Sequence, residues 1–310
     1  MKILVTGGAG FIASHIVDKY IELGHKVVVI DNLSSGKQES IHPKAKFYQA
    51  DIKDTAKIKE IFVLERPEIL NHHAAQMSVR LSVDDPIFDA EVNIIGLLNL
   101  LEAGRQNGLK KIIFASSGGV VYGEANVLPT AENYEPKEPL SPYGVSKFAS
   151  ENYLYFYHKN YHIPYIALRY ANVYGPRQNP HGEAGVVAIF SLKLLKGERP
   201  VVNGDGLQTR DYVYIADVCQ ANINALENAK TGPFNIGTSR ETNVNELFEK
   251  LAKVSHTHLS AIHGPPKKGE QKRSALDISR ARKWLSWEPK ISLSEGLKLT
   301  YESFKNFQKT

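Results

Sequence analysis

Hydrophobic residues in the first half of the chain follow two alternating patterns. Short β-branched runs, such as KILVT at 2–6 and KVVVID at 26–31, predict buried strands, and longer stretches of helical periodicity separate them. The stretches at 58–64, 87–105 and 141–158 predict helices. Strands and helices that alternate at this spacing need right-handed crossovers. The pattern therefore predicts an α/β fold, a doubly wound parallel sheet of the Rossmann type covered on both faces.

The pattern becomes less regular after residue 170. Helices are predicted near 186–196 and 243–254 and over 293–307, and VYIADV at 213–218 reads as a strand. We expect residues 1–170, with returning elements around 211–238, to form a nucleotide-binding domain. Residues 171–310 are expected to form a smaller, interleaved α/β lobe over the carboxyl edge of the sheet, where open α/β sheets bind ligands.

Composition and charge narrow the class of protein. Of the 310 residues, 42% are hydrophobic and 23% charged, and no window approaches the roughly 18 apolar residues that span a bilayer. The chain starts directly in a strand without an export signal, and its single cysteine, Cys219, cannot form an internal disulfide. We therefore expect a soluble cytoplasmic protein. The net charge of +5 is dispersed, so neither a nucleic acid nor a membrane is an expected partner.

The first predicted strand ends in a glycine-rich turn, TGGAGFIA, that leads directly into a helix. Gly7 and Gly10 let the backbone N–H groups and the positive helix end face an anion, although a glycine cluster alone also fits a simple tight turn. The second strand ends at Asp31, about 20 residues later, where a carboxylate can accept hydrogen bonds from a ribose diol. The same charge repels a 2′-phosphate, so NAD is favoured over NADP. Asp51 and Ile52 either flank an adenine ring or serve only as structural residues.

Tyr143 and Lys147 lie four residues apart in SPYGVSK, hence on one face of a predicted helix. A phenol has an ordinary pKa of about 10, so a tyrosine that acts as a base near neutrality needs that pKa lowered by about three units, or roughly 4 kcal/mol. Lys147 can supply part of this shift as a nearby cation. A bound oxidised nicotinamide can supply more, because an opposite charge favours the phenolate.

Eight segments together carry a resemblance to a known family: TGGAGFIAS, DNLSSG, HHAAQ, SSGGVVYG, SPYGVSK, RYANVYGPR, RDYVYIADV and WEPK. In this order they resemble the extended short-chain dehydrogenase/reductases, and within them the UDP-glucose (UDP-galactose) 4-epimerases, over nearly the whole chain. The resemblance implies a cytoplasmic isomerase of galactose metabolism with tightly held NAD. It implies oxidation at C4 of a UDP-sugar, a transient 4-keto intermediate and return of the hydride to the other face. It also implies a homodimer paired through the helices at 87–105 and 141–158.

The cofactor residues that this resemblance implies come from the glycine turn, the strand ends and the predicted Tyr–Lys helix. They are Gly7, Gly10, Phe11, Ile12, Asp31, Asn32, Ser35, Gly36, Asp51, Ile52, Ala74, Ala75, Gln76, Asn93, Ser116, Tyr143, Lys147 and Tyr170. His72 and His73 face opposite ways on a strand, without a third ligand at a plausible spacing. We interpret them as core or supporting groups and expect no metal.

The catalytic residues implied are Tyr143, Lys147 and a hydroxyl at the tip of the strand SSGGVVYG. The commoner epimerases have a third hydroxyl where this chain has Gly118. Either Ser117 takes over or Tyr143 acts without a hydroxyl partner, and we favour Ser117 because paired glycines at a strand end indicate a close approach to a ligand. Ser116 is either a structural hydroxyl or a nicotinamide contact. In a third interpretation both serines bind only backbone groups.

The substrate residues implied lie mostly in the second lobe. They are Ser117, Asn172, Val187, Ala188, Asn203, Arg210, Tyr212, Lys267, Glu270 and Ser274. Arg210 is expected at a phosphate, or else paired with Asp211. Lys267 would contact phosphate as a point charge and Glu270 would hold ribose hydroxyls.

Two positions of the second lobe depart from the family pattern and bear on the substrate. Asn203 replaces an aromatic residue that commonly packs on uridine, which weakens the inference to UDP. Ser274 replaces a bulky tyrosine found in some epimerases. This small residue leaves room at C2 or C5, so N-acetylated or uronic UDP-sugars are also expected substrates.

Two other functions remain open at this point. A 4,6-dehydratase or decarboxylase of the same fold is disfavoured, because the resemblance implies that those enzymes place a carboxylate at the strand tip, and no acid lies between Ser117 and Tyr122. A non-catalytic NAD-binding sensor or interaction protein is disfavoured by the intact Tyr143 and Lys147, although Gly118 is a change that an inactive relative could carry.

Overall fold

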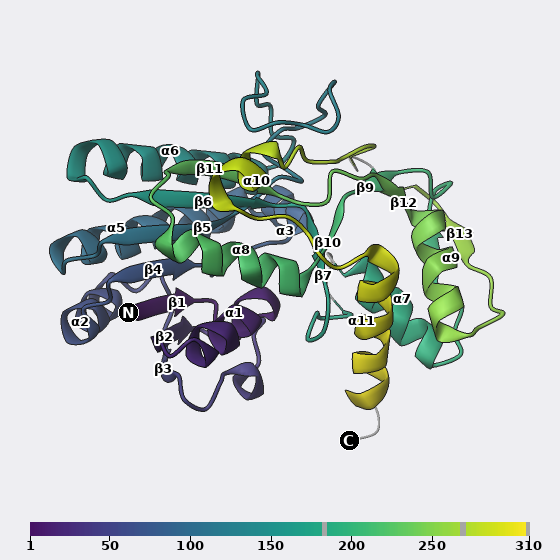
Figure 1. The fold of residues 1–310 in the computed structure, drawn as a ribbon, viewed down its shortest axis with the longest axis horizontal. Helices are drawn as coiled ribbons and strands as arrows, with labels where there is room; N and C mark the ends of the chain where they lie inside the picture. The colour runs from purple at the N-terminus through teal and green to yellow at the C-terminus, as the bar shows by residue number, and fades with distance from the viewer. Residues whose placement is uncertain (182–184, 267–270, 308–310) are drawn as a thin grey trace.

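The larger part of the protein is a seven-stranded parallel sheet, shown in Figure 1. The computed structural model describes residues 1–181, 185–266 and 271–307. The strand order is β11-β6-β5-β4-β1-β2-β3, and every neighbouring pair is parallel. The direction of strand order reverses between β1 and β4, which is where doubly wound sheets bind ligands. The predicted α/β fold is confirmed.

The strands of this sheet are short and mostly buried. They are β1 (Lys2–Thr6), β2 (Lys26–Asp31), β3 (Lys46–Gln49), β4 (Ile69–His72), β5 (Lys111–Ser117), β6 (Tyr165–Tyr170) and β11 (Gly232–Ile236). Pairing aligns Thr6 with His72 and Ser117 with Tyr170. The register therefore brings the polar strand ends together at one edge.

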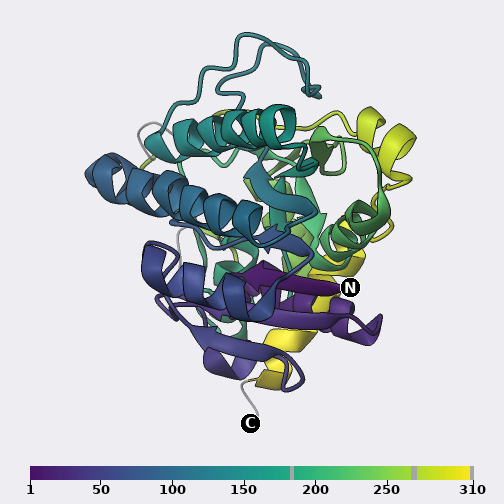
Figure 2. The same ribbon diagram turned by 90° about the vertical axis from the view of Figure 1, so that its left-hand side faces the viewer.

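Helices cover both faces of the sheet because alternate strand residues are apolar on both sides. One layer contains α2 (Thr55–Glu65), α5 (Gly96–Gln106) and α6 (Pro142–Tyr161), which lie side by side in Figure 2. The other contains α1 (Phe11–Glu22) and α8 (Ile215–Glu227), with α10 (Ser279–Leu285) next to β11. Leu4 packs with the first layer, and Ile3 and Val5 pack with the second.

The helix predicted over 87–105 is interrupted. It consists of α4 (Pro86–Ala90), a π-helical turn η2 (Glu91–Ile95) and α5, and it follows a short α3 (Val79–Asp84). The π turn lets Asn93 point inward, where its amide donates hydrogen bonds to the Gln76 carbonyl at 2.9 Å and the Asp89 carboxylate at 2.9 Å. Single π turns of this kind are frequent at functional sites.

Of the strand predicted at 213–218, only residues 213 and 214 are in a strand. β10 (Tyr212–Tyr214) ends before Ile215, which begins α8. Asp217 lies in the first turn of α8, where an acid suits the helix dipole, and its carboxylate accepts hydrogen bonds from the backbone N–H groups of Lys290 and Ile291. These contacts made late in the chain explain why the local pattern misplaced the boundary.

The second lobe stands beside the carboxyl edge of the sheet, at the right of Figure 1. It contains α7 (Val186–Leu195), α9 (Val244–Ser255) and α11 (Leu293–Phe307), all close to their predicted positions. Its strands form small pairs: β7 (Asn172–Tyr174) with β10, β8 (Val201–Asn203) with β13 (Ile262–Gly264), and β9 (Thr209–Arg210) with β12 (Thr242–Asn243). One hydrophobic cluster runs from the sheet into this lobe. Among the helices of the described ranges, none is long and apolar enough to cross a membrane.

Candidate active site

The glycine turn after β1 forms a cradle for an anion. Gly7 has a φ of +72°, and a Cβ atom there would lie 2.8 Å from the backbone nitrogen of Ala74. Gly10 is the N-cap of α1, and within the described residues no side chain caps this helix end. Phe11 and Ile12 begin the helix, so its first N–H groups stay free for a diphosphate.

The carboxylate of Asp31 stabilises the glycine turn through a hydrogen bond. It accepts hydrogen bonds from the N–H groups of Ala9 at 3.0 Å and Leu33 at 2.8 Å, which leaves further lone pairs for ribose hydroxyls. Asn32 donates a hydrogen bond to Asp51 at 3.2 Å, linking the ends of β2 and β3.

The remaining predicted cofactor residues near this turn differ in exposure. Gly36 packs on Ala9, where a Cβ atom would lie 2.8 Å from that residue's own Cβ, and Ser35 is exposed. Ile52 is buried in the hydrophobic layer, and a Cβ atom on Gly96 would overlap its side chain. Its packing against α5 favours the structural interpretation of this residue.

The segment after β4 supplies a polar network that the sequence analysis only partly anticipated. Ala74 donates its N–H to Thr6 Oγ1 at 3.1 Å, Ala75 follows, and the Gln76 amide donates to Asp89 at 2.8 Å. Asp89 is fully buried and was not among the predicted residues. Its spacing of four residues from Asn93, which puts both on one helix face, is the signal that could have identified it.

The Lys147 side chain is buried and hydrogen-bonded near the end of β5. Its buried ammonium donates a hydrogen bond to the Ala115 carbonyl at 2.8 Å and lies 5.7 Å from the centre of the Tyr143 ring. Ser141 caps α6 by accepting the Gly144 N–H at 3.1 Å, so the helix starts just before Tyr143. Ser146 donates a hydrogen bond to Asp89 at 2.6 Å, which ties α6 to α4.

Burial shifts the pKa values of Tyr143 and Lys147 in the directions that favour the neutral form of each side chain. The pKa of Lys147 falls to about 8 because desolvation outweighs the attraction of Asp89 and Glu151. The pKa of Tyr143 rises, first through burial and then through the negative charge of Asp89. Neither cause that shifts the pKa of Tyr143 here lowers it, so a bound cationic nicotinamide would have to favour the phenolate.

The two serines at the end of β5 have different surroundings. The Ser116 hydroxyl donates a hydrogen bond to Glu151 at 2.5 Å and is buried, which favours a structural role over a nicotinamide contact. Ser117 ends β5 and is partly exposed. A Cβ atom on Gly118 would overlap the Leu276 side chain, whereas a Cβ atom on Gly119 would have only Ser117 Oγ, at 3.9 Å, within 4 Å. The open side of the tip is therefore the side of Ser117 and Gly119.

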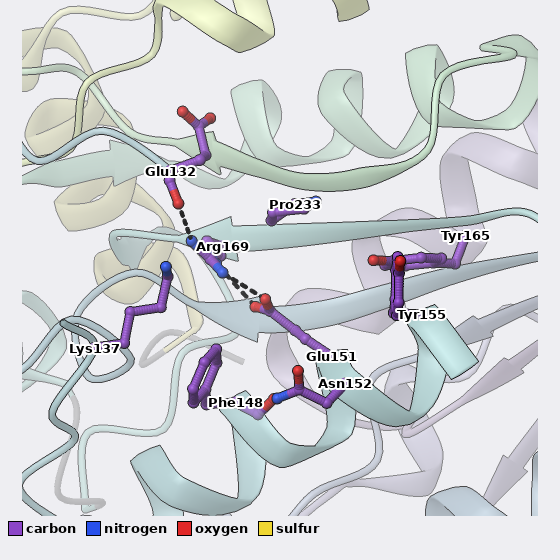
Figure 3. A pocket seen from close by; sticks show the side chains of 9 residues that line it. All are labelled: Glu132, Lys137, Phe148, Glu151, Asn152, Tyr155, Tyr165, Arg169 and Pro233. Atoms are coloured by element: carbon purple, nitrogen blue, oxygen red, sulfur yellow. Dashed lines mark hydrogen bonds and ion pairs between the residues drawn. The ribbon is translucent and has the colours of Figure 1, made fainter. Parts of the chain in front are cut away.

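Behind this tip lies a buried ion pair. Glu151 on α6 accepts two hydrogen bonds from Arg169 on β6, at 2.9 and 2.6 Å, and Arg169 also donates to the Tyr122 hydroxyl at 2.8 Å. The pair borders a cleft of about 310 Å³ that Glu132 and Lys137 line on its other sides, as Figure 3 shows. None of the predicted site residues is among the residues that line this cleft, so we do not assign it to catalysis.

Several predicted substrate residues lie on the paired strands β7 and β10 and at the start of α7. Tyr212 is buried and packs edge-on against Tyr174, with ring centres 6.4 Å apart. Asn172 is partly exposed, and its N–H donates to the Asp211 carbonyl at 2.8 Å. Val187 and Ala188 are buried at the start of α7, where they support the lobe from inside.

Others lie along the outer strands of the lobe. The Asp211 carboxylate accepts hydrogen bonds from residues 238, 239 and 276, while the Arg210 guanidinium donates to the Thr209 carbonyl at 2.8 Å. Asn203 is partly exposed at the end of β8, and Ser274 is buried. Lys267 and Glu270 lie outside the described residues.

The two histidines of HHAAQ contact opposite layers. His72 shares a hydrogen bond with Thr6 Oγ1 at 2.7 Å and stacks on Phe114 of β5, whose side chain packs with the α5–α6 layer. His73 stacks on Tyr170 and its Nε2 lies 3.1 Å from the Tyr170 hydroxyl. In the described part of the chain, no three His, Cys, Asp or Glu side chains gather as a metal site.

The Tyr143–Lys147 pair stands at the carboxyl edge of a sheet whose first turn can hold a diphosphate, and this arrangement is typical of enzymes that use a nicotinamide dinucleotide. The chain belongs to the NAD dependent epimerase/dehydratase family, whose model matches residues 3–237. NAD is its cofactor. The residues present fit that cofactor, since the Gly7 turn leaves no room for a side chain and Asp31 retains free lone pairs.

Relatives cover the chain from end to end. A UDP-glucose 4-epimerase of Mycolicibacterium smegmatis is 46% identical over 99% of this chain and 99% of its own length. The crystal structure of a UDP-glucose 4-epimerase from Thermotoga maritima with UDP-glucose is 52% identical, covers 99% of this chain and 100% of that one, and has a TM-score of 0.97. The Thermus thermophilus UDP-glucose 4-epimerase in complex with NAD is 43% identical, with 98% and 99% coverage and a TM-score of 0.94.

Proposed function

We propose that this protein is an NAD-dependent isomerase that inverts C4 of a UDP-hexose, interconverting UDP-glucose and UDP-galactose. The observation that carries the proposal is the Tyr143–Lys147 pair, set by α6 and the Ala115 carbonyl beside the dinucleotide turn. The full-length similarity to UDP-glucose 4-epimerases supports the substrate class. The absence of any acid between Ser117 and Tyr122 in the sequence argues against elimination chemistry.

Tyr143, Ser117 and Lys147 each have a separate role in the reaction at C4. When bound, NAD would supply an acceptor for the C4 hydride and, once reduced, a donor for its return to the sugar. Tyr143 removes the proton of the 4-hydroxyl through its phenolic oxygen and gives it back when the 4-keto sugar has turned over in the pocket. Ser117 positions that hydroxyl, and Lys147 stabilises the phenolate as a fixed cation.

The substrate lobe sets which sugars enter. Arg210 is proposed at the diphosphate, with Asn172 and Tyr212 beside the sugar. Ser274, a small and buried residue, is proposed to lie next to the sugar ring, where its size would leave room for N-acetylated or uronic UDP-sugars as well.

The test is to incubate the purified protein separately with UDP-galactose, UDP-N-acetylglucosamine and UDP-glucuronate, and to follow C4 stereochemistry by proton NMR. We expect UDP-galactose to be converted to UDP-glucose without added reductant. Tyr143→Phe is the control, expected to retain NAD and lose turnover. Wild-type protein that holds NAD but converts none of the three sugars would favour the non-catalytic alternative, and turnover by Tyr143→Phe would place the base elsewhere.

We also propose a cytoplasmic homodimer. Apolar side chains are exposed on α4, η2 and α6, three helices that contact one another. Ile87 is 72% exposed, Ile95 50% and Phe156 45%, which is costly unless a second copy covers them. The cytoplasmic location is proposed from the single, buried Cys219, which has no partner for an internal disulfide.

A further inference from the structure

Asp89 is a fully buried acid on α4 that has no role in the reaction described above. Its Oδ1 atom accepts hydrogen bonds from the side-chain amides of Gln76 at 2.8 Å and Asn93 at 2.9 Å. Its Oδ2 atom accepts a hydrogen bond from the Ser146 hydroxyl at 2.6 Å. One carboxylate therefore binds the segment after β4 and the turn η2 through one oxygen, and α6 through the other.

These contacts anchor the turn of α6 that carries the reacting pair. Ser146 lies three residues after Tyr143 and directly before Lys147. One turn further along, the Ser150 hydroxyl donates to the Asn93 carbonyl at 3.2 Å. Ser146, Ser150 and Asn93 are all buried, so water does not compete for these bonds. The position of Tyr143 relative to the cofactor-side segments thus depends on the bond between Ser146 and the carboxylate.

The Asp89 carboxylate also acts on the pair through its charge. Its three hydrogen-bond donors, described above, are neutral groups. Its charge raises the pKa of Tyr143, an effect second to burial, and partly offsets the lowering of the Lys147 pKa by desolvation. Both effects have the sign expected of a negative charge, which favours the ammonium and disfavours the phenolate.

The other titratable groups around α6 act less directly on this pair. Glu151 lies one turn after Lys147, and its charge is balanced by Arg169 at 2.6 Å. The remaining groups are neutral near pH 7, exposed, or located at the opposite end of α6 or β5. They are His72 and His73, whose pKa burial lowers, the exposed Arg80, Asp84, Asp85 and Glu91, and the distant Glu102, Arg105 and Lys111.

We propose that Asp89 is a positioning residue for the C4 reaction, which fixes the Tyr143–Lys147 turn of α6 against the segment after β4 and whose charge sets the pH range in which that pair works. The inference rests on the proposed epimerase function. Because a negative charge opposes ionisation of the phenol, the enzyme without this charge works at lower pH.

Asp89→Asn tests the charge and keeps the hydrogen bonds. The new amide oxygen can accept from Gln76 and Asn93, and the amide nitrogen can donate to Ser146 Oγ. We expect the acid limb of kcat/KM for UDP-galactose to move to lower pH by about one unit. Asp85→Asn is the matched control, because this exposed acid caps the same helix and asparagine caps equally well. An unshifted profile in Asp89→Asn, or an equal shift in Asp85→Asn, would overturn the role of the charge.

Ser146→Ala tests the anchor and keeps the charge. We expect kcat to fall about tenfold, while KM for UDP-galactose and bound NAD stay within about twofold of wild type and the acid limb does not move. Ser150→Ala removes a longer hydrogen bond one turn away and should lower kcat less than about threefold. A wild-type kcat in Ser146→Ala, or equal losses in both variants, would overturn the positioning role.

A titration without any sugar separates this inference from the proposed function. Carbon-13 NMR of NAD-free protein labelled at lysine Cε reports the pKa of Lys147, with Lys147→Met to assign its signal. We expect this pKa, about 8 in wild type, to fall further in Asp89→Asn because the attraction of the carboxylate is lost. Failure of wild type to convert any UDP-sugar would contradict the epimerase proposal alone, whereas an unchanged Lys147 pKa in Asp89→Asn would refute the role of the Asp89 charge.

Discussion

Lys147 shows how the fold changes the chemistry of one residue. A lysine in water has a pKa of 10.5, and burial beneath β5 lowers it to about 8. The folded protein therefore binds fewer protons than the unfolded chain between pH 8 and 10.5. Its free energy of unfolding should rise with pH across this window as the cost of burying the cation disappears.

Lys147→Met isolates this contribution, because methionine fills a similar volume without a charge. We expect wild type, relative to Lys147→Met, to gain up to about 3 kcal/mol in free energy of unfolding from pH 8 to 10.5 in NAD-free protein. Urea denaturation at several pH values measures the difference. If the difference is constant over this range, Lys147 is not desolvated as the structure indicates.

Ser117 is the hydroxyl left on the open side of the strand tip. Ser117→Ala should lower kcat by on the order of 100-fold while NAD stays bound, because Tyr143 loses the group that orients the substrate hydroxyl. Ser117→Thr keeps the hydroxyl and should retain most of the rate. Steady-state kinetics with UDP-galactose test both variants. An unchanged rate in Ser117→Ala would mean that Tyr143 acts alone.

The surroundings of Gly118 explain why this chain lacks the hydroxyl that the commoner epimerases have at this position. Restoring the serine of the commoner epimerases should not improve this enzyme, because its Cβ would overlap Leu276, a side chain only 1% exposed. We expect Gly118→Ser to lower the free energy of unfolding by about 1–3 kcal/mol. The same change in a Leu276→Ala background should cost less than in wild type. Chemical denaturation of the four proteins gives the coupling, and additive effects would show that no overlap exists.

Helix α6 is the element that organises the site, since it carries Tyr143 and Lys147 and is tied to the sheet by a buried ion pair. Glu151→Gln leaves the Arg169 guanidinium buried without its counter-charge. We expect a loss of about 3 kcal/mol in unfolding free energy, measured by urea denaturation.

An exposed pair provides the control for this element. Lys19 and Glu22 lie 2.6 Å apart on α1 with both side chains about half exposed, so Glu22→Gln should cost less than about 0.5 kcal/mol. Losses of similar size in Glu151→Gln and Glu22→Gln would show that the Arg169 pair does not anchor α6.

For whole helices and strands, hydrophobic periodicity predicted some boundaries well and missed others. Periodicity located α9 and α11 closely because each has one apolar face that must be buried, whereas α7 is apolar over nearly its whole length. It missed the π turn at 91–95 and the start of α8 at Ile215. Both boundaries depend on hydrogen bonds to residues distant in sequence, to Gln76 in one case and Lys290 in the other.

The whole molecule is expected to be a dimer. Ile95→Glu combined with Phe156→Glu places two charges on the exposed apolar surface of η2 and α6 and should produce monomers. Light scattering should give about twice 34.5 kDa for wild type and 34.5 kDa for the double variant. Leu207→Glu, which alters a side chain 63% exposed in the other lobe, is the matched control and should remain dimeric. A wild-type mass near 34.5 kDa would contradict the dimer.

The sequence by itself determined the sheet, the dinucleotide turn and the Tyr143–Lys147 pair. Each of these depends on spacing within a short segment: apolar alternation, glycines before a helix, or two residues one helical turn apart. The tertiary structure alone decided the partners: Glu151 for Ser116, Leu276 opposite Gly118, and Asp89 near Lys147. Those contacts join segments that the chain order keeps far apart, so burial and hydrogen bonding become defined only when the sheet and both layers have assembled.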